Sequence, residues 1–275
     1  MKNTKPKILV FIPAYRCEVQ ITRVLDQFDQ NTQALFDTVM VLDNRSPDDT
    51  LQIAAAHGAR KFTECKFMAC LNRDNYGLGG SHKVAFRYGL KHGFDYLVVL
   101  HGDDQADIRD LTPILSAGLP SDVDCLLGSR FMRGSRLKGY SRFRTFGNIA
   151  YNLLFSLATR REIKDLGSGL NLYKLTTFQD FYYKNFPDDL TFNYVMLLAS
   201  YHRRQNVKYF PISWREEDQR SNVKLFQQAF RVLGLLGRYV LGGGRFLSQE
   251  MRSRPHELYA SDAERADNLS QITGP

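Results

Sequence analysis

The amino-acid sequence predicts an α/β protein built on a doubly wound, mostly parallel sheet. Short apolar runs alternate with segments of helical periodicity through the first half of the chain. Runs such as Lys7–Ile12 and Tyr96–Leu100 are continuously apolar, which is typical of strands covered by helices on both faces. Polar clusters follow these strands directly. Because ligands bind at the carboxyl ends of the strands in such sheets, we expect the functional groups there.

The N-terminal half supplies most of this alternation. After the strand at Lys7–Ile12, the residues Val19, Val24, Leu25 and Phe28 share one face of a helix. The next elements are expected in the order strand Thr38–Leu42, helix Asp48–His57, strand Phe67–Leu71, helix Gly79–His92, strand Tyr96–Leu100 and helix Ile108–Ala117. In this order each helix connects one strand to the next, as in a sheet of parallel strands.

The C-terminal half is less regular. It opens with a basic loop, Arg130–Arg144, which contains arginine and lysine but no acid. The later elements are expected to be helix Phe146–Leu157, strand Gly169–Tyr173, helix Leu190–His202, strand Val207–Ile212 and helix Val223–Leu241. We therefore divide the chain into one α/β domain (1–222), an amphipathic helix (223–247) and a weakly ordered polar tail (248–275).

Composition restricts the class of protein. The apolar runs are short, with five residues in Ile8–Ile12, whereas a membrane-spanning helix needs about 20. The N-terminus is too polar for a signal peptide, so we expect a cytoplasmic protein. The formal charge of +8 and the pI of about 9.3 suit an anionic partner such as a nucleotide, a nucleic acid or an acidic membrane surface. The cysteines lack metal-site spacing and are expected to be ordinary thiols.

The polar clusters indicate a nucleotide site with a divalent cation. Asp43 directly follows the second strand, where a carboxylate can accept from a ribose hydroxyl or a base NH group. The glycines of Gly77–Ser81 open a helix, where backbone amides could approach a diphosphate. The segment His101–Asp107 leaves an apolar strand with several carboxylates, which suits Mg²⁺ together with substrate phosphates. Because no nicotinamide-type glycine fingerprint follows the first strand, a dinucleotide oxidoreductase is disfavoured.

Seven motifs occur together in one order. They are Pro13-Ala14-Tyr15 with Glu18, Asp43-Asn44-Arg45-Ser46-Pro47-Asp48, Asn75-Tyr76-Gly77-Leu78-Gly79, His101-Gly102-Asp103-Asp104-Gln105, Gly128-Ser129-Arg130-Phe131, Arg144 with Gly147-Asn148, and Asp165-Leu166-Gly167-Ser168-Gly169. This set resembles the family 2 glycosyltransferases of the GT-A fold, particularly their polyprenyl-phosphate (dolichyl-phosphate-mannose-synthase-like) branch. The resemblance implies a metal-dependent, inverting transfer of a sugar from a nucleotide-sugar to a polyprenyl phosphate or a related lipid.

The resemblance also implies roles for individual residues. Donor and cofactor contacts are implied for Pro13, Ala14, Tyr15, Glu18, Asp43, Asn44, Asn75, Gly79, Lys83, Gly102 and Asp103. The cation, Mg²⁺ or Mn²⁺, is implied at Asp103 and Gln105, with His101. Acceptor contacts are implied for Arg130, Arg144, Asn148, Ser168, Arg220 and Ser221. Asp103, Arg130, Arg144 and Asp165 are the expected catalytic residues.

Two departures from the family pattern leave alternatives open. His101 stands where the family has the first aspartate of its metal motif, so the identity of the metal is open. Asn44 replaces a second carboxylate, which leaves uridine and guanosine open as the base of the donor. A hydroxyl acceptor would need a general base, for which Asp165 is the candidate, whereas an ionised phosphate acceptor would not.

Other functions and partners follow from the same residues. The alternatives are transfer to a glycan hydroxyl in surface polysaccharide synthesis and a nucleotide-binding module without turnover. Lys224, Arg231, Arg238 and Arg245 form a basic stripe on the final helix. This helix could lie on the inner membrane surface, pack on the core or mediate a homo-oligomer. No nucleic-acid partner is expected, because the chain carries no recognised nucleic-acid motif.

Overall fold

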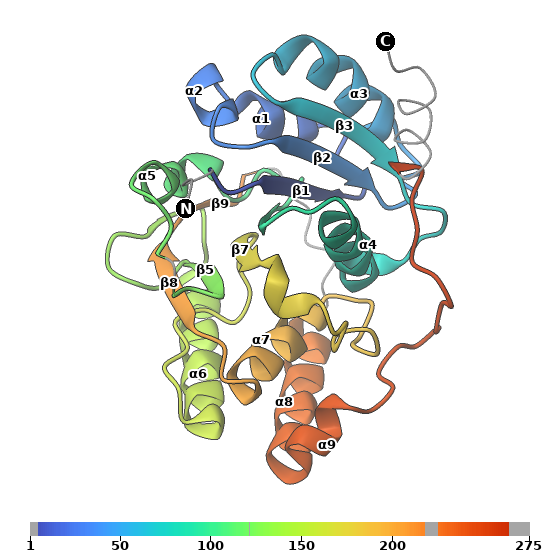
Figure 1. The fold of residues 1–275 in the computed structure, drawn as a ribbon. Coiled ribbons are helices and arrows are strands. Elements are labelled where there is room, and N and C mark those ends of the chain that lie inside the picture. The colour runs from blue at the N-terminus through green and yellow to red at the C-terminus, as the bar shows by residue number, and fades with distance from the viewer. Residues whose placement is uncertain (1–4, 121, 218–224, 264–275) are drawn as a thin grey trace.

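The computed structural model describes residues 5–120, 122–217 and 225–263, and within this part of the chain a central sheet is covered by helices on both faces (Figure 1). The strands are β1 (Ile8–Ala14), β2 (Thr38–Asp43), β3 (Lys66–Leu71), β4 (Tyr96–Leu100), β5 (Cys125–Ser129), β6 (Arg136–Lys138), β7 (Leu170–Lys174), β8 (Val207–Pro211) and β9 (Ser213–Arg215). The α-helices are α1 (Ile21–Asp26), α2 (Gln30–Gln33), α3 (Thr50–Lys61), α4 (Gly77–Lys91), α5 (Thr112–Ser116), α6 (Arg142–Thr159), α7 (Phe192–His202), α8 (Leu225–Gly242) and α9 (Gly244–Leu247). Two 3₁₀ turns, η1 (Ile108–Asp110) and η2 (Leu175–Phe178), complete the list.

The main sheet has the strand order β3-β2-β1-β4-β7-β5-β8, and it is mostly parallel as predicted. β1 pairs in parallel with β2 and β4, and β2 pairs in parallel with β3. The exception is β7, which runs antiparallel to both β4 and β5. The chain order reverses at β1, so β2 and β4 place their carboxyl ends beside that of β1.

Each face of the sheet has its own apolar core, because successive side chains of a strand point to opposite faces. In β1, Leu9 and Phe11 pack with α4 and α7, whereas Val10 and Ile12 pack with α1 and α3. Every residue of β1 and β2 is buried. This explains why both strands are continuously apolar in sequence.

Two elements of the second half differ from the prediction. The strand β5 was not predicted, and it pairs between β7 and β8 in the main sheet. The expected basic loop instead contains β6, which pairs with β9, and the start of α6 at Arg142. All three residues of β6 are exposed, so no apolar period marks it as a strand. Both elements depend on pairing with segments that are distant in sequence.

The C-terminal part also departs from the prediction where it is described. α8 ends at Gly242, and Gly243 has a φ of 51°, which separates it from α9. Residues 248–263, expected to be weakly ordered, pack on the α/β domain and bury Tyr259, Ala260 and Ala263. Ser261 forms an antiparallel bridge with Asn72, so this segment lies beside the carboxyl end of β3. Residues 264–275 lie outside the described part.

Candidate active site

The carboxyl ends of β1, β2 and β4 bring three of the predicted motifs together. Ala14 pairs with Asp43, and the Asn44 amide donates to the Ala14 carbonyl at 2.9 Å. The Gly102 amide donates to the Pro13 carbonyl at 3.1 Å, and a Cβ atom at Gly102 would lie 3.0 Å from that oxygen. Glycine is therefore needed at position 102 so that the chain after β4 can lie against the chain after β1.

Asp43 has the geometry of a ligand-binding carboxylate. The residue is only 1% exposed, and its Oδ1 accepts from the Ser46 amide at 2.8 Å. Its Oδ2 is buried and has no hydrogen-bond partner among the described residues. A buried carboxylate oxygen without a donor is costly, so the arrangement suits a hydroxyl or NH group supplied by a ligand.

The residues after β1 surround this carboxylate but differ in exposure. Tyr15 is 42% exposed, and the Arg16 guanidinium lies 5.5 Å from its ring centroid. Glu18 is exposed and accepts a long 3.3 Å hydrogen bond from the Asp49 amide. Burial, together with the charges of Asp103, Asp48 and Asp43, raises the pKa of the Cys17 thiol to about 12. The negative charges of the three motifs therefore converge around this one thiol.

Asn44 is occupied within the protein. Its Nδ2 donates to Asn75 Oδ1 at 2.8 Å, and its Oδ1 accepts from Asn72 Nδ2 and from the Tyr76 amide. These bonds fix the loop that carries Asn75, whose side chain is exposed. The geometry therefore makes Asn44 a positioning residue for this loop, which differs from the predicted contact with the base.

The glycine turn at the start of α4 does not leave its amides open to a diphosphate. The Gly79 and Gly80 amides donate to the Asp188 carbonyl at 2.7 and 3.3 Å. A Cβ atom at Gly79 would lie 2.3 Å from the Pro187 carbonyl oxygen, and Gly77 has a φ of 70°. These glycines allow close packing against the loop at residues 187–188. The Gly79 amide is therefore engaged within the protein, and a contact between Gly79 and the nucleotide stays a prediction.

Lys83 also faces away from the carboxyl ends of β1 and β2. Its Nζ donates to the Phe186 carbonyl at 2.6 Å and to Asp188 Oδ1 at 2.7 Å, and lies 4.8 Å from the ring centroid of Tyr259. Burial lowers the pKa of Lys83 to about 8, although the Asp188 carboxylate opposes that shift. Lys83 therefore holds the 186–188 loop and the C-terminal segment together, and its predicted donor contact is not supported.

Replacing Lys83 by methionine should lower the free energy of unfolding by about 1.5–3 kcal/mol, because Asp188 would lose a charged hydrogen-bond partner. Nucleoside-diphosphate affinity should stay within about twofold. Urea unfolding and calorimetry measure the two effects. Lys91→Met, an exposed position on the same helix, is the control. A stable Lys83→Met protein with much weaker nucleotide binding would show that Lys83 contacts the nucleotide-sugar after all.

The segment after β4 offers a small set of cation ligands. Asp103 Oδ1 accepts from the Gln105 amide at 3.2 Å, and burial, with the charges of Asp104 and Glu216, raises the pKa of Asp103 to about 6. Burial lowers the pKa of His101 to about 4, and His101 Nε2 has no partner in the described residues. A neutral imidazole nitrogen and one carboxylate fit a cation that takes its remaining ligands from a diphosphate.

This donor set is incomplete as a metal site formed by the protein alone. No group of three His, Cys, Asp or Glu side chains able to hold a metal occurs within residues 5–120, 122–217 and 225–263. The adjacent Asp104 is buried and engaged by Arg23, Gln27 and Arg215. A divalent cation at Asp103, Gln105 and His101 therefore remains a prediction, and it would depend on the nucleotide.

Replacing Asp103 by asparagine should remove the dependence of nucleoside-diphosphate affinity on Mn²⁺ or Mg²⁺, because a neutral amide is a weaker ligand for a hard cation. Calorimetry with and without chelator measures this directly in one protein sample. Affinity that still rises on adding metal to Asp103→Asn would place the cation elsewhere.

Arg130 and Asp165 form a buried ion pair instead of facing a ligand. Arg130 Nε and Nη2 donate to the two Asp165 carboxylate oxygens at 2.8 Å each, and Nη2 also donates to the Gly167 carbonyl. The Asp165 oxygens accept further bonds from the Arg130 and Gly167 amides. The guanidinium lies 4.9 Å from the ring centroid of Trp214. Asp165 is therefore not available as a general base, and Arg130 is not available as a phosphate ligand in this conformation.

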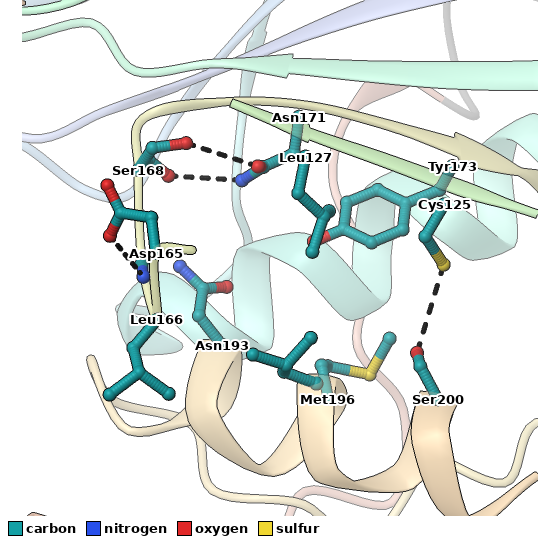
Figure 2. Close-up of a pocket in the computed structure, with 12 residues that line it drawn as sticks. Cys125, Leu127, Asp165, Leu166, Ser168, Asn171, Tyr173, Asn193, Met196 and Ser200 are labelled. Atoms are coloured by element: carbon teal, nitrogen blue, oxygen red, sulfur yellow. Dashed lines mark hydrogen bonds between the residues drawn. The ribbon is translucent and has the colours of Figure 1, made fainter. Parts of the chain in front are cut away.

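Ser168 lies beside this pair and is also internal. Its Oγ donates to the Leu170 carbonyl and lies 3.2 Å from Asn171 Oδ1. Figure 2 shows Ser168 and Asp165 on the wall of a small cavity that reaches Asn193 and Ser200. Its volume of about 20 Å³ is room for one water molecule, so a sugar or lipid cannot enter it. Ser168 is therefore not placed to contact an acceptor. Arg220 and Ser221 lie outside the described residues.

Arg144 belongs to an accessible cluster at the start of α6, which we call the Tyr140 cluster (Tyr140, Arg144, Asn148 and Glu216). The Arg144 guanidinium lies 4.7 Å from the Tyr140 ring centroid and donates to Glu216 Oε2 at 2.5 Å. Asn148 Nδ2 donates to the Tyr140 hydroxyl at 2.9 Å. The structure thus brings together Arg144 and Asn148, the two residues of this motif for which the family resemblance implies acceptor contacts.

Tyr140 and Glu216 were missed from sequence. Glu216 follows Arg215 in the only acidic run near the end of the domain, but nothing local indicates that it reaches Arg144, 72 residues away. Tyr140 is one of three aromatic residues of the basic loop, and its position between Arg130 and Arg144 could have suggested cation–π stacking.

Comparisons with known proteins agree with this geometry. The chain matches the family model described as Glycosyl transferase family 2 over residues 9–182, more than half of its length. It is 26% identical over 176 residues to an undecaprenyl-phosphate mannosyltransferase of Micrococcus luteus, in a match covering 62% of this chain and 68% of that protein. It is 22% identical over 168 residues to a polyprenol monophosphomannose synthase of Mycolicibacterium smegmatis, covering 61% and 62% of the two chains.

The fold also matches solved structures. Glucosyl-3-phosphoglycerate synthase of Mycobacterium tuberculosis has a TM-score of 0.60 and 16% identity to this chain, covering 86% of this chain and 81% of its own. The same enzyme has been solved with Mn²⁺, uridine-diphosphate-glucose and glycerol 3-phosphate, and that structure again gives a TM-score of 0.60 at 16% identity, over 86% and 80% of the two chains. At this identity the likeness concerns the GT-A fold alone.

Proposed function

Because the chain belongs to glycosyl transferase family 2, we propose that it transfers one sugar, with inversion, from a nucleoside-diphosphate sugar to a polyprenyl phosphate. The observation that carries this proposal is the position of Glu216, which pairs with Arg144 and also contributes, after burial and the Asp104 carboxylate, to the raised pKa of Asp103. On this basis the carboxylate expected on the donor side and the cation expected on the acceptor side would flank one site. The names of the two sequence relatives support the lipid acceptor.

The donor would lie across the carboxyl ends of β1, β2 and β4. Asp43 Oδ2 would accept from a ribose hydroxyl or a base NH group, and the Asn44-anchored loop would place Asn75 beside it. Tyr15 is exposed at the same edge and could cover the base. A cation held by Asp103, Gln105 and His101 would neutralise charge on the leaving diphosphate.

The acceptor phosphate would lie in the Tyr140 cluster. Arg144 lies in the first turn of α6, where its guanidinium and the helix dipole both favour an anion. Asn148, one turn later, donates through Nδ2 to the Tyr140 hydroxyl and to the Arg144 carbonyl, so it would position the cluster. In the absence of substrate, Glu216 pairs with Arg144. An incoming phosphate would take the place of the Glu216 carboxylate as the anion bound to Arg144. Tyr140 would keep the guanidinium plane oriented.

The reaction then requires little proton transfer. A phosphate oxygen of the acceptor forms a bond to the anomeric carbon as the bond from that carbon to the nucleoside diphosphate breaks. The acceptor is already ionised, so no general base is needed. A glycan hydroxyl would need one, and Asp165 is tied to Arg130 by both oxygens. This favours the phosphate acceptor over the hydroxyl.

Incubation with nucleotide-sugars, Mn²⁺ and polyprenyl phosphates tests the proposal. We expect nucleoside-diphosphate release that depends on the lipid for at least one donor. Activity with a glycan hydroxyl and none with any lipid phosphate would refute the acceptor. Binding of nucleotide-sugars without turnover on either acceptor would favour a binding module.

The proposal includes contact with the membrane surface where the lipid resides. No helix in the described part of the chain is long and apolar enough to cross a bilayer. α8 carries exposed Phe230, Val240 and Leu241, and buries Val232 and Leu236 against the domain. It therefore packs on the core with one face and presents an apolar face with the other, as an interfacial helix would.

A further inference from the structure

α6 exposes an unusual amount of apolar surface. Phe155 of α6 is buried in the core, but six other large apolar side chains of this helix are between 44% and 77% exposed, whereas surface apolar residues are normally scattered singly. They are Phe143, Phe146, Ile149, Leu153, Leu154 and Leu157. Their spacing of three and four residues places most of them on one stripe of the helix. Such a stripe requires a partner.

An open groove of about 730 Å³ runs beside this stripe. Ile149, Leu153 and Leu157 of α6 form one side, and Phe131, Met132 and Ile163 contribute apolar surface to the rest. Sites that bind small molecules typically have volumes of about 300–1,000 Å³. The groove is therefore large enough to hold a ligand, and its apolar lining suits a hydrocarbon chain.

One end of the groove meets the Tyr140 cluster. Phe131 lines the groove, and its ring centroid lies 6.1 Å from that of Tyr140. Ile149 follows Asn148 directly on α6. The groove then follows α6 toward Arg160 and Arg161, at the end of the helix that projects away from the sheet (Figure 1). A chain attached to a phosphate at Arg144 would enter the groove at Phe131.

The rim of the groove is basic. Arg133, Arg160 and Arg161 line it, and none of the three forms an ion pair with another described residue. Lys164 lies 3.6 Å from Glu162, the one acid among the lining residues. These cations would attract an anionic bilayer at the distal end of α6. If two copies of the chain docked through this surface, their basic rims would face each other and repel. This repulsion favours the lipid over a second copy as the occupant of the groove.

We propose that this groove seats the isoprenoid chain of the lipid acceptor, with the phosphate in the Tyr140 cluster and the distal basic rim against the anionic bilayer. The inference rests on the proposed function and adds the path of the lipid chain to it. It accounts together for the exposed stripe of α6, the groove and the unpaired arginines at its rim.

Binding of geranyl phosphate and of geranylgeranyl phosphate, whose chain is twice as long, tests the inference by calorimetry. The protein should bind the longer lipid at least about tenfold more tightly, because the added chain buries apolar surface in the groove. Leu153→Glu should reduce that preference to within about twofold and leave geranyl phosphate binding similar. Leu153 is 59% exposed, so the substitution should not unfold the protein.

Leu258→Glu is the matched control, because Leu258 is 50% exposed and does not line the groove. It should keep the full chain-length preference. Leu153→Glu with an unchanged preference would overturn the inference, even if that variant changed from dimer to monomer in sedimentation. Equal binding of both lipids by the unmodified protein would overturn it while leaving the phosphate acceptor intact. Binding of neither lipid would overturn the acceptor proposal as well.

Discussion

Replacing Arg144 by alanine should lower kcat/KM for a polyprenyl phosphate by roughly 30- to several-thousand-fold. The guanidinium is held between the Tyr140 ring and the Glu216 carboxylate, and it is the described cation best placed to receive the acceptor phosphate. Removing it would also leave Glu216 close to the incoming anion. Nucleotide-sugar affinity should stay within about twofold, since Asp43 and the segment after β4 are unchanged.

Arg142→Ala is the matched control, because Arg142 begins the same helix, is exposed and has no predicted role. Its kcat/KM should remain within a few-fold of the unmodified protein, roughly as expected for an exposed position. Steady-state transfer with varied lipid, together with calorimetry for the donor, separates the two variants. Equal losses in both would mean that general positive charge at the helix start matters and that Arg144 has no specific role.

Replacing Asp165 by asparagine should lower the free energy of unfolding by about 3–5 kcal/mol. The side chains of Arg130 and Asp165 are only 9% and 1% exposed, so the substitution would leave a buried guanidinium without its carboxylate. If the acceptor is a lipid phosphate, the sequence predicts only a mild effect of this substitution on transfer, because no general base is needed. The structure predicts that the large effect is on stability.

The readout separates the structural role from a catalytic one. Chemical denaturation should show the loss of stability, and transfer assayed well below the unfolding temperature should retain most of the activity per folded molecule. Glu162→Gln, at an exposed carboxylate nearby, should change stability by no more than about 0.5 kcal/mol. A stable Asp165→Asn protein with at least about 100-fold slower transfer would identify Asp165 as the general base after all.

Most of the sheet and part of the donor site could be predicted from sequence because they depend on local patterns. β1, β2, β3 and β4 are short apolar runs, and a parallel sheet places the residues after them at one edge. Asp43 and Asp103 therefore converge as expected. Arg144 and Asn148 share one face of α6 because this helix begins at Arg142, whereas the sequence predicts a helix beginning only at Phe146.

The remaining assignments failed where a distant segment supplied the partner. The glycines at the start of α4 resemble a phosphate turn, but the Asp188 carbonyl accepts from their amides. Lys83 pairs with Asp188 at a separation of 105 residues, and Arg130 pairs with Asp165 at 35. A basic or glycine-rich motif has the same sequence whether it binds a ligand or another part of the chain. The packed C-terminal segment was missed for the same reason, since its partner is the carboxyl end of β3.

The linkage of the transferred sugar tests the central claim most directly. After incubation with nucleotide-sugar, Mn²⁺ and polyprenyl phosphate, the lipid product can be isolated and examined by mass spectrometry and ³¹P NMR. We predict a phosphodiester in which the anomeric carbon of one sugar is bonded to the lipid phosphate, and its absence with Arg144→Ala under matched conditions. A product that keeps the phosphate as a monoester, with the sugar on a hydroxyl group, would contradict the proposed reaction.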